Sequence, residues 1–328
     1  MNSAVLSSGQ RFFRRVLGYA RDGLVFIAIF ALLGWTGSWH RIPELFAHFF
    51  LQYALALVCL GTLLLLGRDR KWFMIALVML TLTGYAIAPF WMPADSTPAS
   101  AHPARLSVLQ FNVALQPEPL LRWLSAHRGE ADVVLVLEMS LLSAAETKIL
   151  ADEFPYRIDK IDESPFSIAL LSRYPLHEPQ VLDLIGPTFP ALQADIVTSG
   201  GTLRLVGIHP PPPIDAELAE WRNRFMTALA SRLVEDSAPG RATLVFGDFN
   251  STRWSPHLRD FMARTALSDA HRGQGAPGTW PAVTARYSGL LGIPMDMMLI
   301  SPGVTVLSRH IGPDLGSDHL PVLTEIEF

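Results

Sequence analysis

The sequence predicts an α/β domain preceded by membrane-spanning helices, and three observations support this prediction. Half of the 328 residues are hydrophobic, and the apolar excess lies in the first 92 residues. From Arg105 onward, short apolar runs alternate with helical periodicities, which is typical of layered α/β folds. Several of these apolar runs also stop abruptly at polar residues, as a buried strand does when it ends at a binding site.

The clearest of these terminations is Thr243–Asn250, an apolar run that reaches Gly247 and then presents Asp248 and Asn250. Side chains two residues apart on a strand point to the same side, so Asp248 and Asn250 are expected to project together. Gly247 lets the backbone pass close to a neighbouring group without a Cβ atom in the way. An ordinary turn closing a strand is the alternative for this stretch taken alone.

Three apolar segments, Gly23–Trp39, Leu45–Gly67 and Trp72–Met92, precede the α/β part. A helix needs about 17–25 apolar residues to cross a bilayer, so the first segment is near the lower limit and the others suffice. A cleaved signal peptide is disfavoured because no clear small-x-small site follows the first segment. Soluble buried helices are the remaining alternative.

The basic residues next to these segments predict an orientation. Four arginines precede the first segment, and Arg68, Arg70 and Lys71 lie between the second and third, whereas the loop His40–Glu44 has a single arginine. The positive-inside rule then places the N-terminus in the cytoplasm, and three spans deliver everything after Met92 to the other side. We expect a multi-pass inner-membrane protein with a periplasmic domain.

The domain organisation expected is a membrane region at 1–92, a linker at 93–104 rich in Pro, Ala and Ser, and a soluble domain at 105–328. The soluble domain carries 18 Lys and Arg against 26 Asp and Glu, a net charge of −8. That charge is a poor match for non-specific binding to nucleic acid. Cys59 is the single cysteine, so neither an intrachain disulfide nor a cysteine-based metal site is possible.

Apolar runs bounded by turn residues predict the strands of the soluble domain, and apolar residues every three or four positions predict its helices. In chain order the predicted elements are strand Leu106–Val113, helix Glu118–His127, strand Asp132–Glu138, helix Leu142–Phe154, strands Ser167–Leu171, Ala191–Val197 and Leu203–Ile208, helix Asp215–Val234 with Asp215 as its cap, strand Ala242–Phe246, helix Pro256–Thr265, and strands Met297–Ile300, Val304–Leu307 and Val322–Ile326.

Polar residues recur where these strands end or begin. They are Asn112, Glu138, His209, Asp248 with Asn250, Asp296, and Asp318 with His319. Each alone has an ordinary explanation, such as a turn or a hydrogen-bonded core histidine, but their recurrence favours a common site. Carboxylates are hard oxygen ligands suited to Mg²⁺ or Mn²⁺, and a histidine held by a carboxylate suits proton transfer. The asparagines can orient a phosphoryl oxygen or a water.

These residues resemble the endonuclease/exonuclease/phosphatase superfamily, which includes deoxyribonucleases, abasic-site endonucleases, sphingomyelinases and inositol-polyphosphate phosphatases. The resemblance spans Arg105 to Phe328 and rests on these elements in order: Gln110-Phe111-Asn112, Asp132 to Glu138, Leu170–Pro175, Gly207-Ile208-His209, Gly247-Asp248-Phe249-Asn250, Gly278-Thr279-Trp280-Pro281, Asp296 and Gly316-Ser317-Asp318-His319. It implies a four-layer α/β sandwich with two central sheets, flanking helices and an active site at one edge.

The resemblance implies that Glu138 binds the metal ion and that Asn112 supports the metal and the phosphate. Asp318 is expected to support the same region, and His209 to hydrogen-bond the phosphate. The implied cofactor is Mg²⁺ or Mn²⁺, with one or two ions left open.

The resemblance also implies that Asp248 and Asn250 position or activate the attacking water, and that Asp296 orients His319. Whether Asp248 or His319 takes the proton stays open.

Departures from the family pattern bear on the substrate. Leu137 stands where a glutamine often precedes the metal-binding glutamate, Ala114 where abasic-site nucleases carry an acidic residue, and His209 where those nucleases often have tyrosine. These differences argue against abasic-site repair. A nucleic acid and a phospholipid head group remain the two candidate substrates, and a non-catalytic binding or scaffold module is the alternative of another class.

Overall fold

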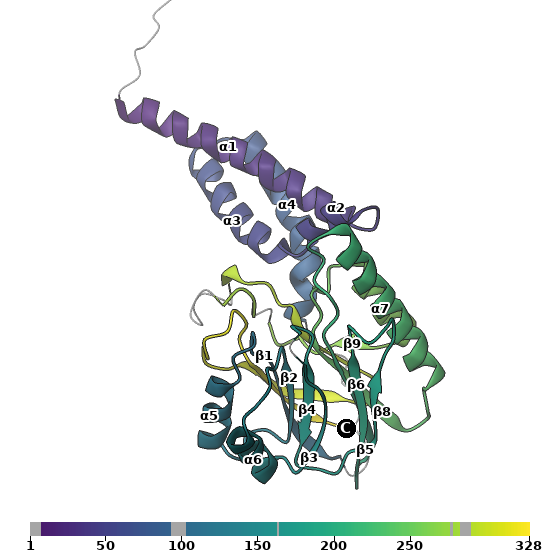
Figure 1. Cartoon of the computed structure of the whole chain (residues 1–328). Helices are drawn as coiled ribbons and strands as arrows, with labels where there is room; N and C mark the ends of the chain where they lie inside the picture. Colours follow the sequence, from purple (N-terminus) through teal and green to yellow (C-terminus); the bar gives the residue numbers. More distant parts are fainter. Residues whose placement is uncertain (1–7, 93–102, 163, 276–277, 283–289) are drawn as a thin grey trace, which may run out of the picture. The chain divides into compact units, whose positions relative to one another are not determined.

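The computed structural model describes residues 8–92, 103–162, 164–275, 278–282 and 290–328. The chain divides into two compact units, Met1–Pro89 and Phe90–Phe328, and each is described by itself. Figure 1 shows the helical first unit in purple and blue and the mixed second unit in teal, green and yellow.

The first unit consists of α1 (Ser8–Trp35), α2 (Arg41–Ala47), α3 (Phe50–Leu66) and α4 (Arg70–Ile87), which runs into the short η1 (Ala88–Phe90). The stretches Ser8–Trp35 and Arg70–Phe90 are long and apolar enough to span a membrane. The pair α2 and α3, bent by 60°, would make a third span if it acts as one broken span.

Three spans were expected. Among the described residues two helices qualify, and the number reaches three only if α2 and α3 form one broken span; the bounds also differ from the prediction. The first span lies inside a helix that begins at Ser8 and ends at Trp35, before the predicted end at Trp39. The second is interrupted between α2 and α3. The orientation of these helices stays a prediction.

The second unit is built on two mixed six-stranded sheets, with the orders β11-β12-β1-β2-β4-β3 and β5-β6-β7-β8-β10-β9. The first sheet contains β1 (Arg105–Asn112), β2 (Val133–Leu137), β3 (Tyr156–Lys160), β4 (Ile168–Ser172), β11 (Thr305–Ile311) and β12 (Val322–Glu327). The second contains β5 (His177–Leu182), β6 (Ala191–Thr198), β7 (Gly201–Ile208), β8 (Arg241–Asp248), β9 (Ser268–Asp269) and β10 (Asp296–Ile300).

Apolar side chains from the facing sides of the two sheets form one buried cluster, including Leu135, Leu205 and Phe246. The outer face of the first sheet is covered by α5 (Glu118–Ala126) and α6 (Ala144–Glu153), and that of the second by α7 (Ala216–Glu235) and α8 (Pro256–Thr265). The second unit therefore has the predicted four layers of helix, sheet, sheet and helix (Figure 1).

The predicted strands and helices of this unit are present with shifts of at most two residues at their ends, except that β11 ends at Ile311 and not at Leu307. Asp215 caps α7, accepting a hydrogen bond from the Leu218 N–H at 2.8 Å. Three strands, β3, β5 and β9, were not predicted. Strands β3 and β5 lie at sheet edges with mostly exposed or half-exposed side chains, and β9 has two residues, so none shows the apolar run of a central strand.

The strand directions bring the predicted site residues to a common edge. Strands β1 and β2 are parallel in the first sheet, and β7 and β8 are parallel in the second. The hydrogen bond from Asn112 at the end of β1 to Asp248 at the end of β8 shows that the four strands end on the same side. Strands β10 and β12 run antiparallel to β8 and β1, so they begin there. We call this side of the two sheets the site edge.

Candidate active site

Asn112 and Glu138 meet at the ends of the neighbouring strands β1 and β2. The Asn112 Nδ2 donates to Glu138 Oε1 at 2.8 Å and to Asp248 Oδ2 at 3.4 Å. The Asn112 Oδ1 accepts from the Ala114 N–H at 3.1 Å, which fixes the amide. Glu138 has a left-handed backbone with φ 53°, an unusual conformation for glutamate that turns the chain where β2 ends.

The Glu138 side chain keeps 24% of its surface exposed. Burial raises the pKa of Glu138, while the hydrogen bond from Asn112 and the charge of His319 partly oppose that rise. The carboxylate thus combines partial burial with access to solvent.

His209 follows β7 and faces both Glu138 and Asp248. Its Nε2 lies 3.8 Å from Glu138 Oε1 and 3.7 Å from Asp248 Oδ2, and its ring packs against Phe166. Burial lowers the pKa of His209 more than the charge of Asp248 raises it. A neutral imidazole in this position can donate one hydrogen bond toward the space between the carboxylates.

Asp248 and Asn250 form a tight turn after β8. The Asn250 N–H donates to Asp248 Oδ1 at 2.8 Å, and the Asn250 Nδ2 donates to the Pro210 carbonyl at 2.9 Å. Gly247 has φ 138°, and a Cβ there would collide with the Ile208 backbone, so the turn requires glycine. Burial raises the pKa of Asp248, against the opposing charge of His319.

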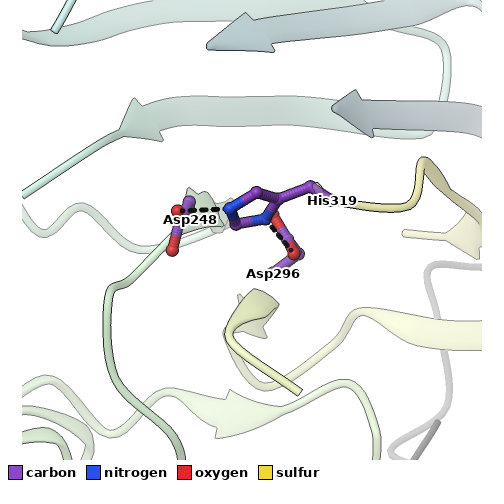
Figure 2. A group of neighbouring side chains, drawn as sticks. All are labelled: Asp248, Asp296 and His319. Carbon is purple, nitrogen blue, oxygen red and sulfur yellow. Dashed lines mark hydrogen bonds and ion pairs between the residues drawn. The ribbon is translucent and has the colours of Figure 1, made fainter. Parts of the chain in front are cut away.

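His319 lies between two carboxylates (Figure 2). Its Nδ1 is 2.9 Å from Asp296 Oδ2, and its Nε2 is 3.6 Å from Asp248 Oδ2. Burial alone lowers the pKa of His319, but the charges of Asp296 and Asp248 outweigh it and raise the pKa to about 10. The arrangement Asp296–His319–Asp248 therefore favours an imidazolium whose two nitrogens both face carboxylates.

The segment that carries His319 is tied to β1 and to the loop before β10. Ser317 Oγ donates to the Asn112 carbonyl at 2.7 Å and accepts from the His319 N–H at 3.0 Å. Trp280 Nε1 donates to Asp318 Oδ2 at 3.0 Å, which holds the exposed Asp318 at the side of the site. These contacts fix a chain segment that would otherwise be a free loop.

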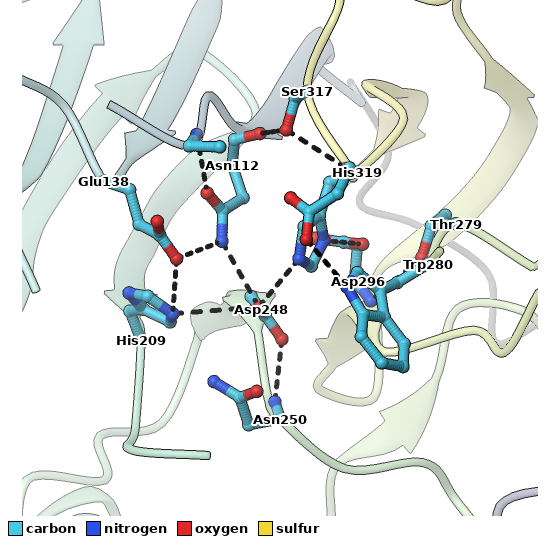
Figure 3. Close-up of polar contacts among 12 residues, drawn as sticks. Asn112, Glu138, His209, Asp248, Asn250, Thr279, Trp280, Asp296, Ser317 and His319 are labelled. Carbon is cyan, nitrogen blue, oxygen red and sulfur yellow. Dashed lines mark hydrogen bonds and ion pairs between the residues drawn. The ribbon is translucent and has the colours of Figure 1, made fainter. Parts of the chain in front are cut away.

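The structure thus brings the predicted residues together at the site edge (Figure 3). Directly connected by the contacts above are Asn112, Glu138, His209, Asp248, Asp296 and His319, while Asn250 contributes its backbone N–H and Asp318 adjoins through Trp280.

Three supporting residues had no role assigned from the sequence. Trp280 lies in the stretch Gly278–Pro281 that resembles the family pattern, but nothing in the sequence indicates its hydrogen bond to Asp318. Arg309 Nη2 donates to the Asp296 carbonyl at 3.1 Å from inside β11, and Phe166 packs against the ring of His209. Each contact joins residues far apart in the chain.

Two places in the site could hold a metal ion. Asp248, Asp296 and His319 each place one ligand atom within 4.8 Å of the others, and all three are buried. Both nitrogens of His319, however, already face carboxylates. Glu138 instead offers a partly exposed carboxylate, which suits an ion that keeps several of its waters.

Comparison with known proteins identifies the same fold. The model of the Endonuclease/Exonuclease/phosphatase family matches residues 109–319. No protein of curated function matches the chain.

Among solved structures, an endonuclease/exonuclease/phosphatase from Beutenbergia cavernae is 17% identical, with a TM-score of 0.53 over 68% of this chain and 72% of that one. A family protein from Bacteroides thetaiotaomicron is 14% identical, with a TM-score of 0.53 over 69% and 99%. D. rerio TDP2 complexed with a single-strand DNA product is 16% identical, with a TM-score of 0.51 over 68% and 99%. At these identities the likeness concerns the fold.

Proposed function

The chain belongs to the endonuclease/exonuclease/phosphatase family, and we propose that it is a divalent-metal-dependent phosphoesterase that hydrolyses its substrate by attack of water. The proposal extends to a membrane-anchored protein whose second unit lies outside the cytoplasm. The observation that supports it most is the convergence of Glu138, Asp248 and the Asp296–His319 pair from both sheets on one point of the site edge.

The donor chemistry of the site fits Mg²⁺ or Mn²⁺. Glu138 would hold the ion, with Asn112 orienting its carboxylate by hydrogen bonding and Asp318 supporting the same region. An ion bound there would neutralise phosphate oxygens and the charge that develops on the leaving oxygen. A partly exposed carboxylate is the type of ligand that these ions use beside their waters.

The residues of the chain supply orientation and proton transfer. In its neutral form, His209 can donate from Nε2 to a phosphate oxygen, and the Asn250 N–H keeps Asp248 aimed at the site. Asp296 fixes the orientation of His319 and favours its charged form. The attacking water gives its proton to Asp248, or to His319 where its imidazole is neutral, as the water oxygen bonds to phosphorus, and the broken P–O bond leaves its electron pair on the departing oxygen.

Turnover of a generic soluble diester tests the proposal. Full-length chain in non-ionic detergent is assayed with bis(4-nitrophenyl) phosphate in Mg²⁺, Mn²⁺ or EDTA. We expect metal-dependent release of nitrophenol and a loss of at least about 10²-fold on His319→Ala. His310→Ala, which removes an exposed histidine from β11, is the matched control and should retain activity. If neither Mg²⁺ nor Mn²⁺ supports turnover, or if His319→Ala and His310→Ala are equally active, the alternative of a non-catalytic binding module is favoured.

The orientation is tested separately from the chemistry. If the second unit is periplasmic, protease added to bacterial cells whose outer membrane alone has been opened should digest it. Protection of the unit until the inner membrane is also disrupted would contradict this placement while leaving the enzymatic proposal unaffected.

A further inference from the structure

Exposed aliphatic side chains lie in several loops at the site edge. We propose that the substrate is an amphiphilic phosphate ester held in a lipid surface, and that these side chains enter the lipid around it. This inference rests on the proposed phosphoesterase function and adds the class of its substrate.

The loops at the site edge expose large aliphatic side chains, which we call the aliphatic rim. Leu115 lies in the loop after β1, Leu141 in the loop after β2 and Ile214 in the loop after β7, with exposed fractions of 43%, 66% and 74%. Leu290 and Leu291, in the segment before β10, are 54% and 58% exposed. Exposed apolar residues are ordinary when scattered, but these gather on the loops that adjoin one site.

Hydrogen bonds hold part of the rim directly beside the site residues. The Leu115 N–H donates to the Glu138 carbonyl at 2.9 Å. Ala114 and Leu115 both have left-handed backbones, with φ 47° and 62°, a conformation that is unfavourable for residues with a Cβ atom. The fold thus keeps a leucine exposed next to the proposed metal ligand despite that cost.

The loop that carries Ile214 is fixed on the other side of the site. Its Pro210 carbonyl accepts the hydrogen bond from Asn250 Nδ2 at 2.9 Å. Four consecutive prolines then lead to Ile214, and their fixed φ angles restrict the loop. A stiff loop can present an aliphatic side chain to a lipid surface with little loss of conformational entropy.

Basic side chains, which a nucleic acid would require, are scarce at this edge. In the described strand ends and loops of the site edge, the Lys or Arg residues are Lys160 at the end of β3, Arg253 and Arg272, and Arg253 is paired with Asp269 at 3.3 Å. At the opposite edge, strand ends and loops carry Arg105, Arg128, Arg173 and Arg241. Residues from 105 onward also sum to −8. Without a basic track at the site, the phosphate backbone of a nucleic acid has little to bind.

A lipid phosphate ester matches both features. Its phosphate fits the polar site, while the surrounding acyl chains accept aliphatic side chains that water does not favour. Hydrolysis adds the oxygen of one water to phosphorus and breaks one P–O ester bond, whose electron pair stays on the departing oxygen. That oxygen receives a proton, so the products are an alcohol and a phosphate-bearing fragment.

The test compares lipid and soluble substrates for full-length variants. Mixed micelles contain non-ionic detergent and equal amounts of phosphatidylethanolamine and phosphatidylglycerol, and products are followed by phosphorus NMR. Bis(4-nitrophenyl) phosphate and plasmid DNA are assayed in parallel. The rim variant combines Leu115→Asn, which suits the left-handed backbone, with Leu141→Ser and Ile214→Ser.

The control variant removes the same kind of exposed surface elsewhere. Val197→Ser in β6, Val234→Ser in α7 and Leu307→Ser in β11 replace aliphatic side chains with exposed fractions of 56%, 50% and 39%. Every variant keeps the first unit, so any difference reflects engagement of substrate by the site edge.

We expect the chain to hydrolyse a micellar lipid, and the ratio of lipid turnover to soluble-diester turnover to fall by about tenfold or more in the rim variant. The control variant should leave that ratio unchanged. An equal ratio in both variants, intact lipids beside a hydrolysed soluble diester, or faster cleavage of plasmid DNA would each overturn the inference. Absence of turnover with the lipid, the soluble diester and the DNA alike would instead contradict the proposed function.

Discussion

Replacing Asp296 with asparagine removes one charge from the Asp296–His319 pair while keeping its shape. The two carboxylates beside His319 raise its pKa from 6.5 to about 10, a difference worth about 5 kcal/mol at about 1.4 kcal/mol per pH unit. Asp296 is the nearer of the two, at 2.9 Å against 3.6 Å for Asp248. We expect Asp296→Asn to bring the pKa of His319 well below 10.

The turnover rate of Asp296→Asn should fall together with the pKa of His319. General acid–base catalysis by a well-oriented side chain contributes about 10²–10⁴-fold, and an asparagine neither favours the charged imidazole nor fixes the same tautomer. Turnover of bis(4-nitrophenyl) phosphate and a nitrogen-15 NMR titration of the histidines measure the two effects on full-length protein. Asp152→Asn, on the exposed face of α6, is the matched control.

The reasoning would be refuted by an Asp296→Asn protein that keeps its activity within about threefold of the parent. A His319 titration unchanged by the substitution would refute it equally, because the pair would then have no electrostatic consequence.

Three other perturbations follow from the geometry. Glu138→Gln should raise the Mg²⁺ concentration for half-maximal activity at least tenfold (~1.4 kcal/mol), and an unchanged metal titration would show that the ion binds elsewhere. Gly247→Ala should destabilise the second unit by about 1–3 kcal/mol or more, because its φ of 138° and the Ile208 backbone leave no room for a Cβ. Thermal melting followed by near-UV circular dichroism measures this loss of stability. An unchanged melting temperature would contradict the prediction. Burial, reinforced by Arg309, lowers the pKa of His271, so the unfolded chain protonates first as the pH falls. Stability should therefore decline below about pH 6.5, by at most about 1.4 kcal/mol per pH unit from this group, with a smaller decline in His271→Gln.

Much of the fold and of the candidate site could be predicted from local pattern. Strand β2 is apolar throughout and is followed by Glu138, and β8 contains the apolar run Leu244–Phe246 before it ends at Asp248. The parallel pairing of β1 with β2 and of β7 with β8 then brings those ends to one edge. The edge strands β3 and β5 escaped prediction because half-exposed strands lack an apolar run.

The supporting contacts could not be predicted because they join distant segments. Trp280 reaches Asp318 across 38 positions, and the Arg309 guanidinium meets the backbone of Asp296 only after β10 and β11 have been placed. The aliphatic rim was also missed, because an isolated leucine in a loop carries no information until its neighbours in space are known.

A diffraction experiment on crystals of the full chain soaked in Mn²⁺ would locate the ion by its anomalous scattering. We expect one strong peak beside the carboxylate of Glu138 at the site edge, and no such peak in Glu138→Gln. Manganese bound between Asp248 and His319, or bound solely at exposed acidic residues away from both, would contradict the assignment of Glu138 as the metal ligand.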